Sequence, residues 1–241
     1  MTLVYRYQNY KSRRNCEIAL TTGDLRYFGE PSCISEQGRD EMLYYQSSSD
    51  AVIIVLHEIY GVNSHIQVVC ERFASKGFDV ICPNLLADGQ VFSYREEAAA
   101  YQNFQINIGF PFAQEQVVSL TEEVRSEYKY CYIVGYSVGA TIAWLCSQRQ
   151  GLYSGVVGYY GSRIRDYRQL VPDCPVLLFF PRKEENFDSG KLIQELSAKK
   201  NVRGIQVETS HGFCNPESDC YDPVEEQSTM RETIFFMKSQ R

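Results

Sequence analysis

Ser137 stands at the centre of the segment Gly135-Tyr136-Ser137-Val138-Gly139, with a glycine two residues before it and another two residues after it. β-Branched residues precede this segment and predict a strand, and residues 140–144 predict a helix after it. A serine on so sharp a turn adopts an unfavourable backbone conformation, and side chains at the two glycine positions would collide. The start of the helix also directs backbone N–H groups at an oxygen that becomes negative during acyl transfer. The pattern predicts a nucleophilic serine, the alternative being a glycine-bounded turn whose serine has no role.

A nucleophilic serine needs a histidine base, which in turn needs an acid to orient it. The chain has three histidines, His57, His65 and His211, and only His211 follows Ser137. Proteins of the α/β-hydrolase fold carry these groups in the order serine, acid, histidine. His211 also follows a predicted strand, at the end where open α/β sheets place their sites. We therefore predict that His211 is the base.

The acid is expected after the predicted strand 176–180, between the serine and the histidine. Three carboxylates follow that strand: Glu184, Glu185 and Asp188. Glu184 lies four residues beyond the predicted strand end, which favours it. Asp188 is equally suited to cap the helix that follows. The sequence predicts Glu184 as the acid and leaves Glu185 and Asp188 as alternatives.

A second informative segment, Leu56-His57-Glu58-Ile59-Tyr60-Gly61, closes the predicted strand 51–56. Acyl transfer needs two backbone N–H donors for the oxyanion, one from the residue after the nucleophile and one from the loop after this strand. Val138 and Ile59 are the residues at those positions. Tyr60, Tyr136 and Phe213 directly flank catalytic positions, and we predict that they line the substrate pocket.

Length, charge and cysteine content limit the classes of protein to which the chain could belong. The chain has 241 residues and a formal net charge of −6, which disfavours a nucleic-acid partner. No apolar run reaches the roughly 18 residues of a membrane span, and the first ten residues lack the features of a secretory signal. The nine cysteines form no CxxC pair and no metal-site spacing. We expect a cytoplasmic protein with reduced thiols, and no metal, cofactor, nucleic-acid partner or membrane partner.

Strands and helices alternate from residue 51 onward, which predicts a mostly parallel central sheet flanked by helices on both faces, the α/β-hydrolase fold. The expected strands are 51–56, 78–82, 130–134, 156–160, 176–180 and 203–207. The expected helices are 63–76, two over 93–127 broken near residues 109–111, one from the Ser137 turn to residue 150, 189–200 and 224–239. Residues 1–50 show short expected strands at 16–21, 25–28 and 41–46, which could form a hairpin on the sheet edge. One domain over residues 1–241 is the simplest interpretation.

Three segments together resemble the dienelactone hydrolase family: His57 to Asn63, Gly135 to Gly139, and His211-Gly212-Phe213. Their order and separations agree with that family, and the resemblance covers about residues 50–240. It implies that Glu58 contacts the nucleophile and helps to control its protonation. The alternative for Glu58 is to cap the helix that starts near residue 63.

The sequence departs from that family at three points. The best-known members use a cysteine nucleophile where this chain has Ser137, so the attack must rely on a histidine base. The family acid is usually aspartate, and Glu184 stands at its position. Asp88 and Asn215 occupy positions at which dienelactone-specific members carry arginines for the substrate carboxylate. An acid at the first position would repel such a substrate, so dienelactone itself is not expected to be cleaved.

We therefore expect a serine hydrolase that cleaves a small ester, lactone or thioester through an acyl-enzyme, without a cofactor. Two alternatives use the same scaffold. A non-catalytic ligand-binding protein is suggested by the unusual acid and the missing arginines. An acyltransferase would use the same residues and would differ in what excludes water from the pocket.

Overall fold

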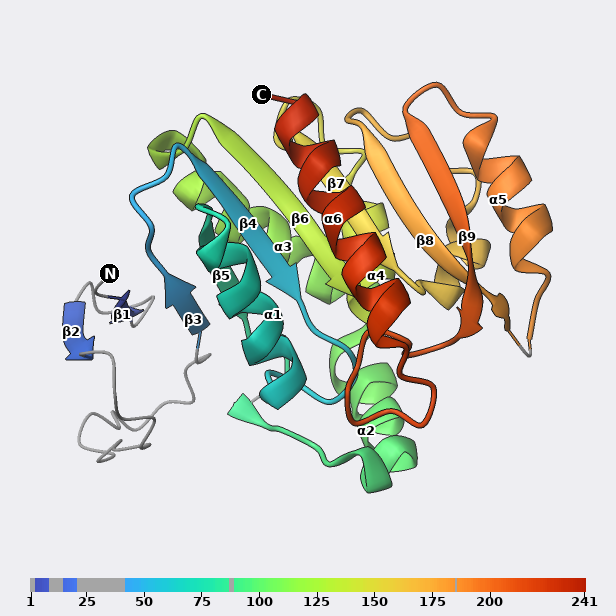
Figure 1. Cartoon of the computed structure of the whole chain (residues 1–241), viewed down its shortest axis with the longest axis horizontal. Helices are drawn as coiled ribbons and strands as arrows, with labels where there is room; N and C mark the ends of the chain where they lie inside the picture. Colours follow the sequence, from blue (N-terminus) through green and yellow to red (C-terminus); the bar gives the residue numbers. More distant parts are fainter. Residues whose placement is uncertain (1–2, 9–14, 21–41, 87–88, 185) are drawn as a thin grey trace.

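The structure is a computed structural model that describes residues 3–8, 15–20, 42–86, 89–184 and 186–241. Within these residues, one sheet has the strand order β2-β1-β3-β5-β4-β6-β7-β8-β9 (Figure 1). Its strands are β1 (Leu3–Gln8), β2 (Asn15–Leu20), β3 (Met42–Tyr45), β4 (Ala51–Leu56), β5 (Asp79–Pro83), β6 (Tyr130–Tyr136), β7 (Gly155–Tyr159), β8 (Val176–Lys183) and β9 (Val202–Ser210). Strands β4 to β9 pair in parallel, and β3 joins β5 antiparallel. The mostly parallel sheet confirms the predicted α/β-hydrolase fold.

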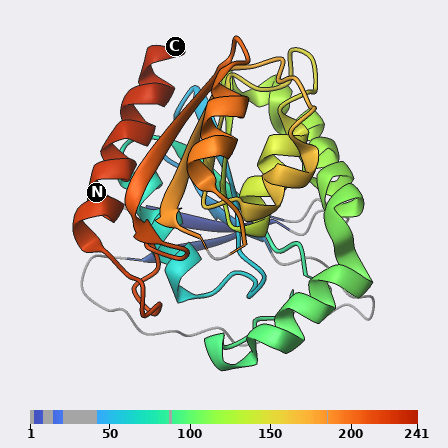
Figure 2. The ribbon, with the colours of Figure 1, turned by 90° about the vertical axis from the view of Figure 1, so that its right-hand side faces the viewer.

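The helices cover both faces of the sheet, as Figure 2 shows from the side. They are α1 (Ser64–Ser75), α2 (Glu97–Asn103), α3 (Gly109–Val124), α4 (Val138–Cys146), α5 (Ser189–Ser197) and α6 (Pro223–Ser239). Shorter helical turns are η2 (Tyr94–Glu96), η3 (Phe104–Ile108), η4 (Arg125–Glu127) and η5 (Ser162–Tyr167). Helices α1 and α6 pack on one face, and α3, α4 and α5 pack on the other.

Strand β4 shows why the sequence has a continuous apolar run at this point. Successive side chains of a strand point to opposite faces, and every residue of β4 is buried. Val52, Ile54 and Leu56 pack in the core under α3, α4 and α5. Ala51, Ile53 and Val55 pack in the core under α1 and α6. Because both faces are covered, the strand needs apolar residues throughout.

Two strands extend further than the sequence predicted. Strands β8 and β9 end at Lys183 and Ser210, three residues beyond the expected ends at 180 and 207. An irregularity in their register between Pro181 and Lys183 allows the pairing to continue past the proline. Glu184 and His211 therefore follow directly after two neighbouring paired strands.

One helix boundary was predicted correctly and another was not. The break expected near residues 109–111 is at Gly109, whose φ of 69° suits a glycine. Helix α4 ends at Cys146 and not at residue 150. The Ser147 amide donates to the carbonyls of Ala143 and Trp144, after which the chain turns at Gly151 with φ 66°.

The N-terminal segment is described only in part. Strands β2 and β3 correspond to the expected strands 16–21 and 41–46, and β1, which pairs antiparallel with β2, was not predicted. The expected strand 25–28 lies outside the described residues. One domain over residues 1–241 stays a prediction. None of the described helices has the length and apolar character needed to cross a membrane.

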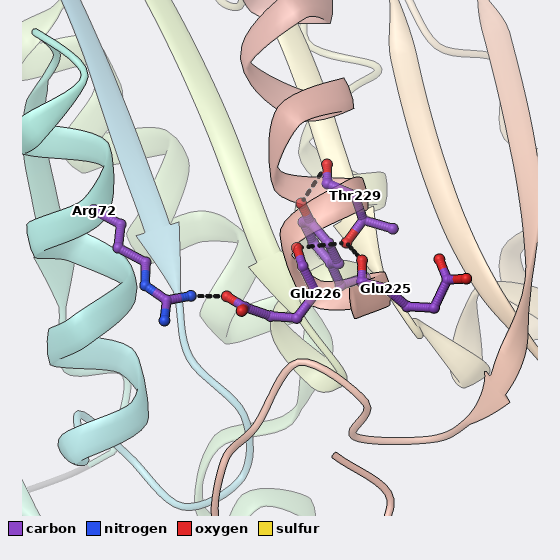
Figure 3. Close-up of polar contacts among 5 residues, drawn as sticks. Arg72, Glu225, Glu226 and Thr229 are labelled. Atoms are coloured by element: carbon purple, nitrogen blue, oxygen red, sulfur yellow. Dashed lines mark hydrogen bonds and ion pairs between the residues drawn. The ribbon is translucent and has the colours of Figure 1, made fainter. Parts of the chain in front are cut away.

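The start of α6 is tied to α1, as Figure 3 shows. Arg72 on α1 forms an ion pair with the mostly buried Glu226 on α6. The Thr229 hydroxyl donates to the carbonyls of Glu225 and Glu226 at 2.7 and 3.1 Å. The Asp222 side chain caps the helix by accepting from two amides of its first turn. These contacts fix the end of the loop that begins at His211.

Candidate active site

Ser137 lies on the turn between β6 and α4, with φ 54° and ψ −113°. Residues other than glycine rarely adopt this backbone conformation. The Ser137 amide donates to the Tyr159 carbonyl at 3.0 Å, which holds the turn against β7. A Cβ at Gly135 would lie 2.1 Å from the Gly139 carbonyl oxygen, and a Cβ at Gly139 would lie 2.4 Å from the Leu56 carbonyl oxygen. Both positions require glycine, as the sequence predicts.

The structure brings three predicted side chains into one hydrogen-bonded line. Ser137 Oγ lies 3.1 Å from His211 Nε2, and His211 Nδ1 lies 3.1 Å from Glu184 Oε1. Because a carboxylate only accepts hydrogen bonds, this arrangement leaves the proton on Nδ1 and a lone pair on Nε2. The Nε2 atom can therefore accept a proton from the serine hydroxyl.

The two other candidate acids are Asp188 and Glu185, of which the structure describes Asp188. The Asp188 side chain caps α5, where it accepts from the Lys191 amide at 3.0 Å. This is the capping role that the sequence offered for it. Glu185 lies outside the described residues. Among the described carboxylates, Glu184 is the one that contacts His211, and its side chain is only 6% exposed.

The two backbone amides predicted to bind an oxyanion belong to residues that line the same pocket as Ser137. Ile59 follows β4, and Val138 is the first residue of α4. Neither amide donates a hydrogen bond to another described residue. The first N–H groups of a helix have no partner within it, so the Val138 amide is available to a ligand.

Glu58 is buried and lines the same pocket as Ser137 and His211. Burial raises the pKa of its carboxyl, while the nearby His211 and the Tyr160 hydroxyl act in the opposite direction. Its Oε2 atom makes no hydrogen bond, and among the described residues no hydrogen bond joins Glu58 to Ser137. The capping alternative is wrong, because Asn63 caps α1 by accepting from the Ile66 amide.

The pocket has a volume of about 980 Å³. Glu58, Ile59, Tyr60, Ser137, Val138, Glu184 and His211 are the predicted site residues that line it. Tyr60 thus occupies the predicted position. The His211 side chain is 41% exposed, so solvent reaches its imidazole ring.

Tyr136 and Phe213 do not line the pocket, contrary to the sequence-based prediction. Both are fully buried in the core under α1 and α6. Tyr136 precedes the turn and points to that face, where its ring stacks on Tyr159 with centroids 4.7 Å apart. Phe213 follows Gly212, whose φ of 83° redirects the chain, and packs against Tyr160 at 5.4 Å. Adjacency in sequence to a catalytic position did not place these side chains beside the site.

The pocket also contains charged and aromatic residues that the sequence analysis missed. They are Tyr94, Glu97 and Tyr101 from η2 and α2, Arg163 and Arg165 from η5, and Lys183 from the end of β8. Arg163 pairs with Asp166, whereas Arg165 donates to the Ser162 carbonyl and lies over the Phe187 ring, 5.2 Å from its centroid. The sequence did contain an indication that η5 lies at the site, because η5 follows the carboxyl end of a predicted strand, where open α/β sheets place their sites.

Dienelactone-specific members carry arginines at the positions of Asp88 and Asn215, and the structure describes the second of these. Asn215 is buried and lines the pocket, where it carries no charge. Its side-chain oxygen accepts from the Glu217 amide at 3.0 Å. Asp88 lies outside the described residues.

Comparison with known proteins places the chain in a family. The model of the dienelactone hydrolase family matches residues 41–240. The Bacillus subtilis uncharacterized protein YczH is 40% identical over 169 residues, which cover 69% of this chain and 82% of that protein. The Pseudomonas putida carboxymethylenebutenolidase is 28% identical over 185 residues, which cover 70% of this chain and 78% of that enzyme.

Solved structures of similar fold include hydrolases. A dienelactone hydrolase-like promiscuous phosphotriesterase from metagenomic libraries has a TM-score of 0.69 at 14% identity, covering 84% of this chain and 93% of that one. A Pyrococcus furiosus esterase has a TM-score of 0.57 at 12% identity, covering 84% of this chain and 88% of that one. At such identities these two structures support the fold alone. The family match over residues 41–240 decides the assignment: the chain belongs to the dienelactone hydrolase family.

Proposed function

We propose that this protein is a serine hydrolase that cleaves a small ester, lactone or thioester through an acyl-enzyme. The observation that carries the proposal is the continuous hydrogen-bonded line from Ser137 through His211 to Glu184. All three residues line one pocket. Membership of a family of hydrolases supports the same reaction class.

In this mechanism Ser137 Oγ attacks the substrate carbonyl while His211 Nε2 takes the hydroxyl proton. The Glu184 carboxylate orients the imidazole and stabilises its positive charge. The amides of Ile59 and Val138 stabilise the oxygen that becomes negative. His211 then protonates the leaving group. A water molecule, deprotonated by the same imidazole, attacks the acyl carbon, and the imidazolium returns that proton to Ser137 Oγ as the acid product leaves.

Hydrolysis is favoured over acyl transfer to another acceptor by the exposure of the base. Because the His211 side chain is 41% exposed, water has direct access to the atom that must activate it. An acyltransferase would have to exclude that water. A non-catalytic binding protein would not require the serine, histidine and acid to be aligned at hydrogen-bonding distances.

We further propose that dienelactone is not the substrate. Asn215, at a position where dienelactone-specific members carry an arginine, supports this because an uncharged amide cannot form an ion pair with the substrate carboxylate. The pocket does contain the cations Arg163, Arg165 and Lys183. Two of them are already engaged, because Arg163 pairs with Asp166 and Arg165 donates to the Ser162 carbonyl and lies over the Phe187 ring.

We also propose that the enzyme acts in the cytoplasm with reduced thiols. Seven described cysteines are free, and six of them are buried among apolar side chains, which supports this proposal.

A fluorophosphonate probe tests the nucleophile. We expect the folded protein to gain one phosphonyl adduct by intact mass, with peptide mapping to Ser137. Ser137→Ala should abolish labelling, whereas Ser162→Ala, which alters another serine of the same pocket, should be labelled like the wild type. An unlabelled wild-type protein, or an adduct on another serine, would contradict the mechanism.

Glu184→Gln should lower kcat for 4-nitrophenyl butyrate by about 10²- to 10⁴-fold, because the amide no longer stabilises the imidazolium and can hold the wrong tautomer. The matched control is Asp188→Asn, since Asp188 caps α5 and does not touch His211. This control should retain kcat and lose no more than about 1 kcal/mol of unfolding free energy. Equal kcat values in the wild type and Glu184→Gln would show that Glu184 is not the acid.

Substrate choice can be tested by comparing dienelactone with 4-nitrophenyl butyrate. We expect kcat/KM for dienelactone to be lower by about 10- to 100-fold, the value of one or two missing charge-assisted hydrogen bonds. Both substrates are measured on one protein preparation, so differences in active fraction cancel. Faster turnover of dienelactone would overturn this proposal and leave the serine mechanism intact.

A further inference from the structure

His57 is a buried histidine that the mechanism does not use as a base. It follows β4 directly, it is 1% exposed, and it does not line the pocket. Its Nδ1 atom lies 2.5 Å from the Glu58 carbonyl oxygen, and its Nε2 atom lies 2.8 Å from the Leu85 amide nitrogen. Both ring nitrogens are therefore engaged with backbone groups of two different loops.

These partners determine the tautomer of the His57 ring. The Leu85 amide can only donate, so Nε2 must accept and carries no proton. The Glu58 carbonyl can only accept, so Nδ1 carries the proton and donates it. Burial lowers the pKa of His57 to about 4, which keeps the ring neutral at physiological pH. His57 is thus a fixed donor to one carbonyl and a fixed acceptor from one amide.

The carbonyl that His57 binds belongs to the same peptide unit as the Ile59 amide. In a planar trans peptide, the C=O and N–H bonds point in opposite directions. A hydrogen bond that fixes the direction of the Glu58 carbonyl therefore also fixes the direction of the Ile59 N–H, away from His57. The Gly61 amide also donates to this carbonyl, at 3.5 Å, so the bond from the His57 ring is the shorter one by 1.0 Å.

The second loop supports this arrangement from the side of β5. Leu85 follows β5, and its bond to His57 connects the segment after β5 to the segment after β4. The two segments also meet where the Phe92 amide donates to the Tyr60 carbonyl at 2.9 Å. A Cβ at Gly61 would lie 2.4 Å from the Gln90 carbonyl oxygen, so the backbones pack in direct contact.

We propose that His57 is a positioning residue that orients the Glu58–Ile59 peptide so that the Ile59 N–H points at the developing oxyanion. The inference rests on the proposed function, in which Ile59 is one of the two oxyanion donors. His57 touches neither the substrate nor the reacting atoms. Its contribution is realised in the transition state, because an amide dipole that is already oriented costs no reorganisation when charge develops.

Three variants separate this role from a general effect on folding. His57→Leu removes both hydrogen bonds. His57→Gln can keep both, because its amide nitrogen can donate to the Glu58 carbonyl and its oxygen can accept from Leu85. His65→Leu is the matched control, since His65 is also buried, has a pKa lowered to about 4 by burial, and packs edge-on against Tyr136 away from the pocket.

The measurements are kcat and KM for 4-nitrophenyl butyrate, and inhibition by a trifluoromethyl ketone compared with the matching methyl ketone. We expect His57→Leu to lower kcat by about 10²-fold with KM changed less than about threefold, as loss of one oxyanion donor should. Affinity for the trifluoromethyl ketone, which mimics the oxyanion, should fall in parallel, whereas affinity for the methyl ketone should not change. His57→Gln should lie within about tenfold of the wild-type kcat, and His65→Leu within about threefold.

The inference is overturned if His57→Leu retains wild-type kcat, or if His65→Leu loses as much kcat as His57→Leu. It is also overturned if both ketones weaken equally, since that indicates a general distortion of the pocket. If His57→Leu does not fold, His57→Phe replaces it with the same expectations, because the phenyl ring fills similar space and makes neither hydrogen bond. An inactive, unlabelled wild-type protein would refute the proposed function itself, which distinguishes that failure from failure of the role of His57.

Discussion

The close contact between the backbone of α4 and the end of β4 is the constraint on which the site depends. A Cβ at Gly139 would lie 2.4 Å from the Leu56 carbonyl oxygen and 2.6 Å from the His57 carbonyl oxygen. This contact presses the turn that carries Ser137 against the strand whose next residues form the segment with Ile59. The two proposed oxyanion amides therefore come from segments that touch through main-chain atoms. Such a contact cannot relax through a side-chain rotamer, so the fold sets the position of Ser137 relative to these two amides.

Buried polar groups without hydrogen bonds lie close to this site. Glu58 Oε2 and the Tyr160 hydroxyl are buried and make no hydrogen bond, and Tyr160 has a positive φ of 43°. Unpaired buried polar atoms and a strained aromatic residue each cost free energy, on the order of 1–3 kcal/mol. They lie beside His211, whose ring centroid is 4.9 Å from that of Tyr160. Costs of this kind concentrate at functional sites, where the surrounding packing can hold strained groups in place.

Features that the backbone determines could be predicted from the sequence, whereas features that depend on where a side chain points could not. Ser137 and His211 could be predicted because chain order and strand ends restrict them, and the hydrogen-bonded line contains both. Glu184 could be favoured but not chosen, because three carboxylates follow β8 and only their positions in space reveal that Asp188 caps α5. Tyr136 and Phe213 were assigned to the pocket wrongly, since the face to which a side chain points depends on turn geometry that a motif does not encode. Arg163 and Arg165 were missed because η5 has no apolar periodicity, although its place after the carboxyl end of a predicted strand indicated the edge of the sheet at which the pocket lies.

The most direct test of the proposed mechanism is a crystal structure of the protein with a phosphonate covalently attached. We expect phosphorus to be bonded to Ser137 Oγ, and one phosphonyl oxygen to accept hydrogen bonds from the amides of Ile59 and Val138 at about 2.7–3.1 Å. His211 should lie beside the adduct and remain bonded to Glu184. A phosphonyl oxygen that points to solvent, with either amide unengaged, would contradict the assignment of the oxyanion site. Phosphorus bonded to any other residue would contradict the assignment of the nucleophile.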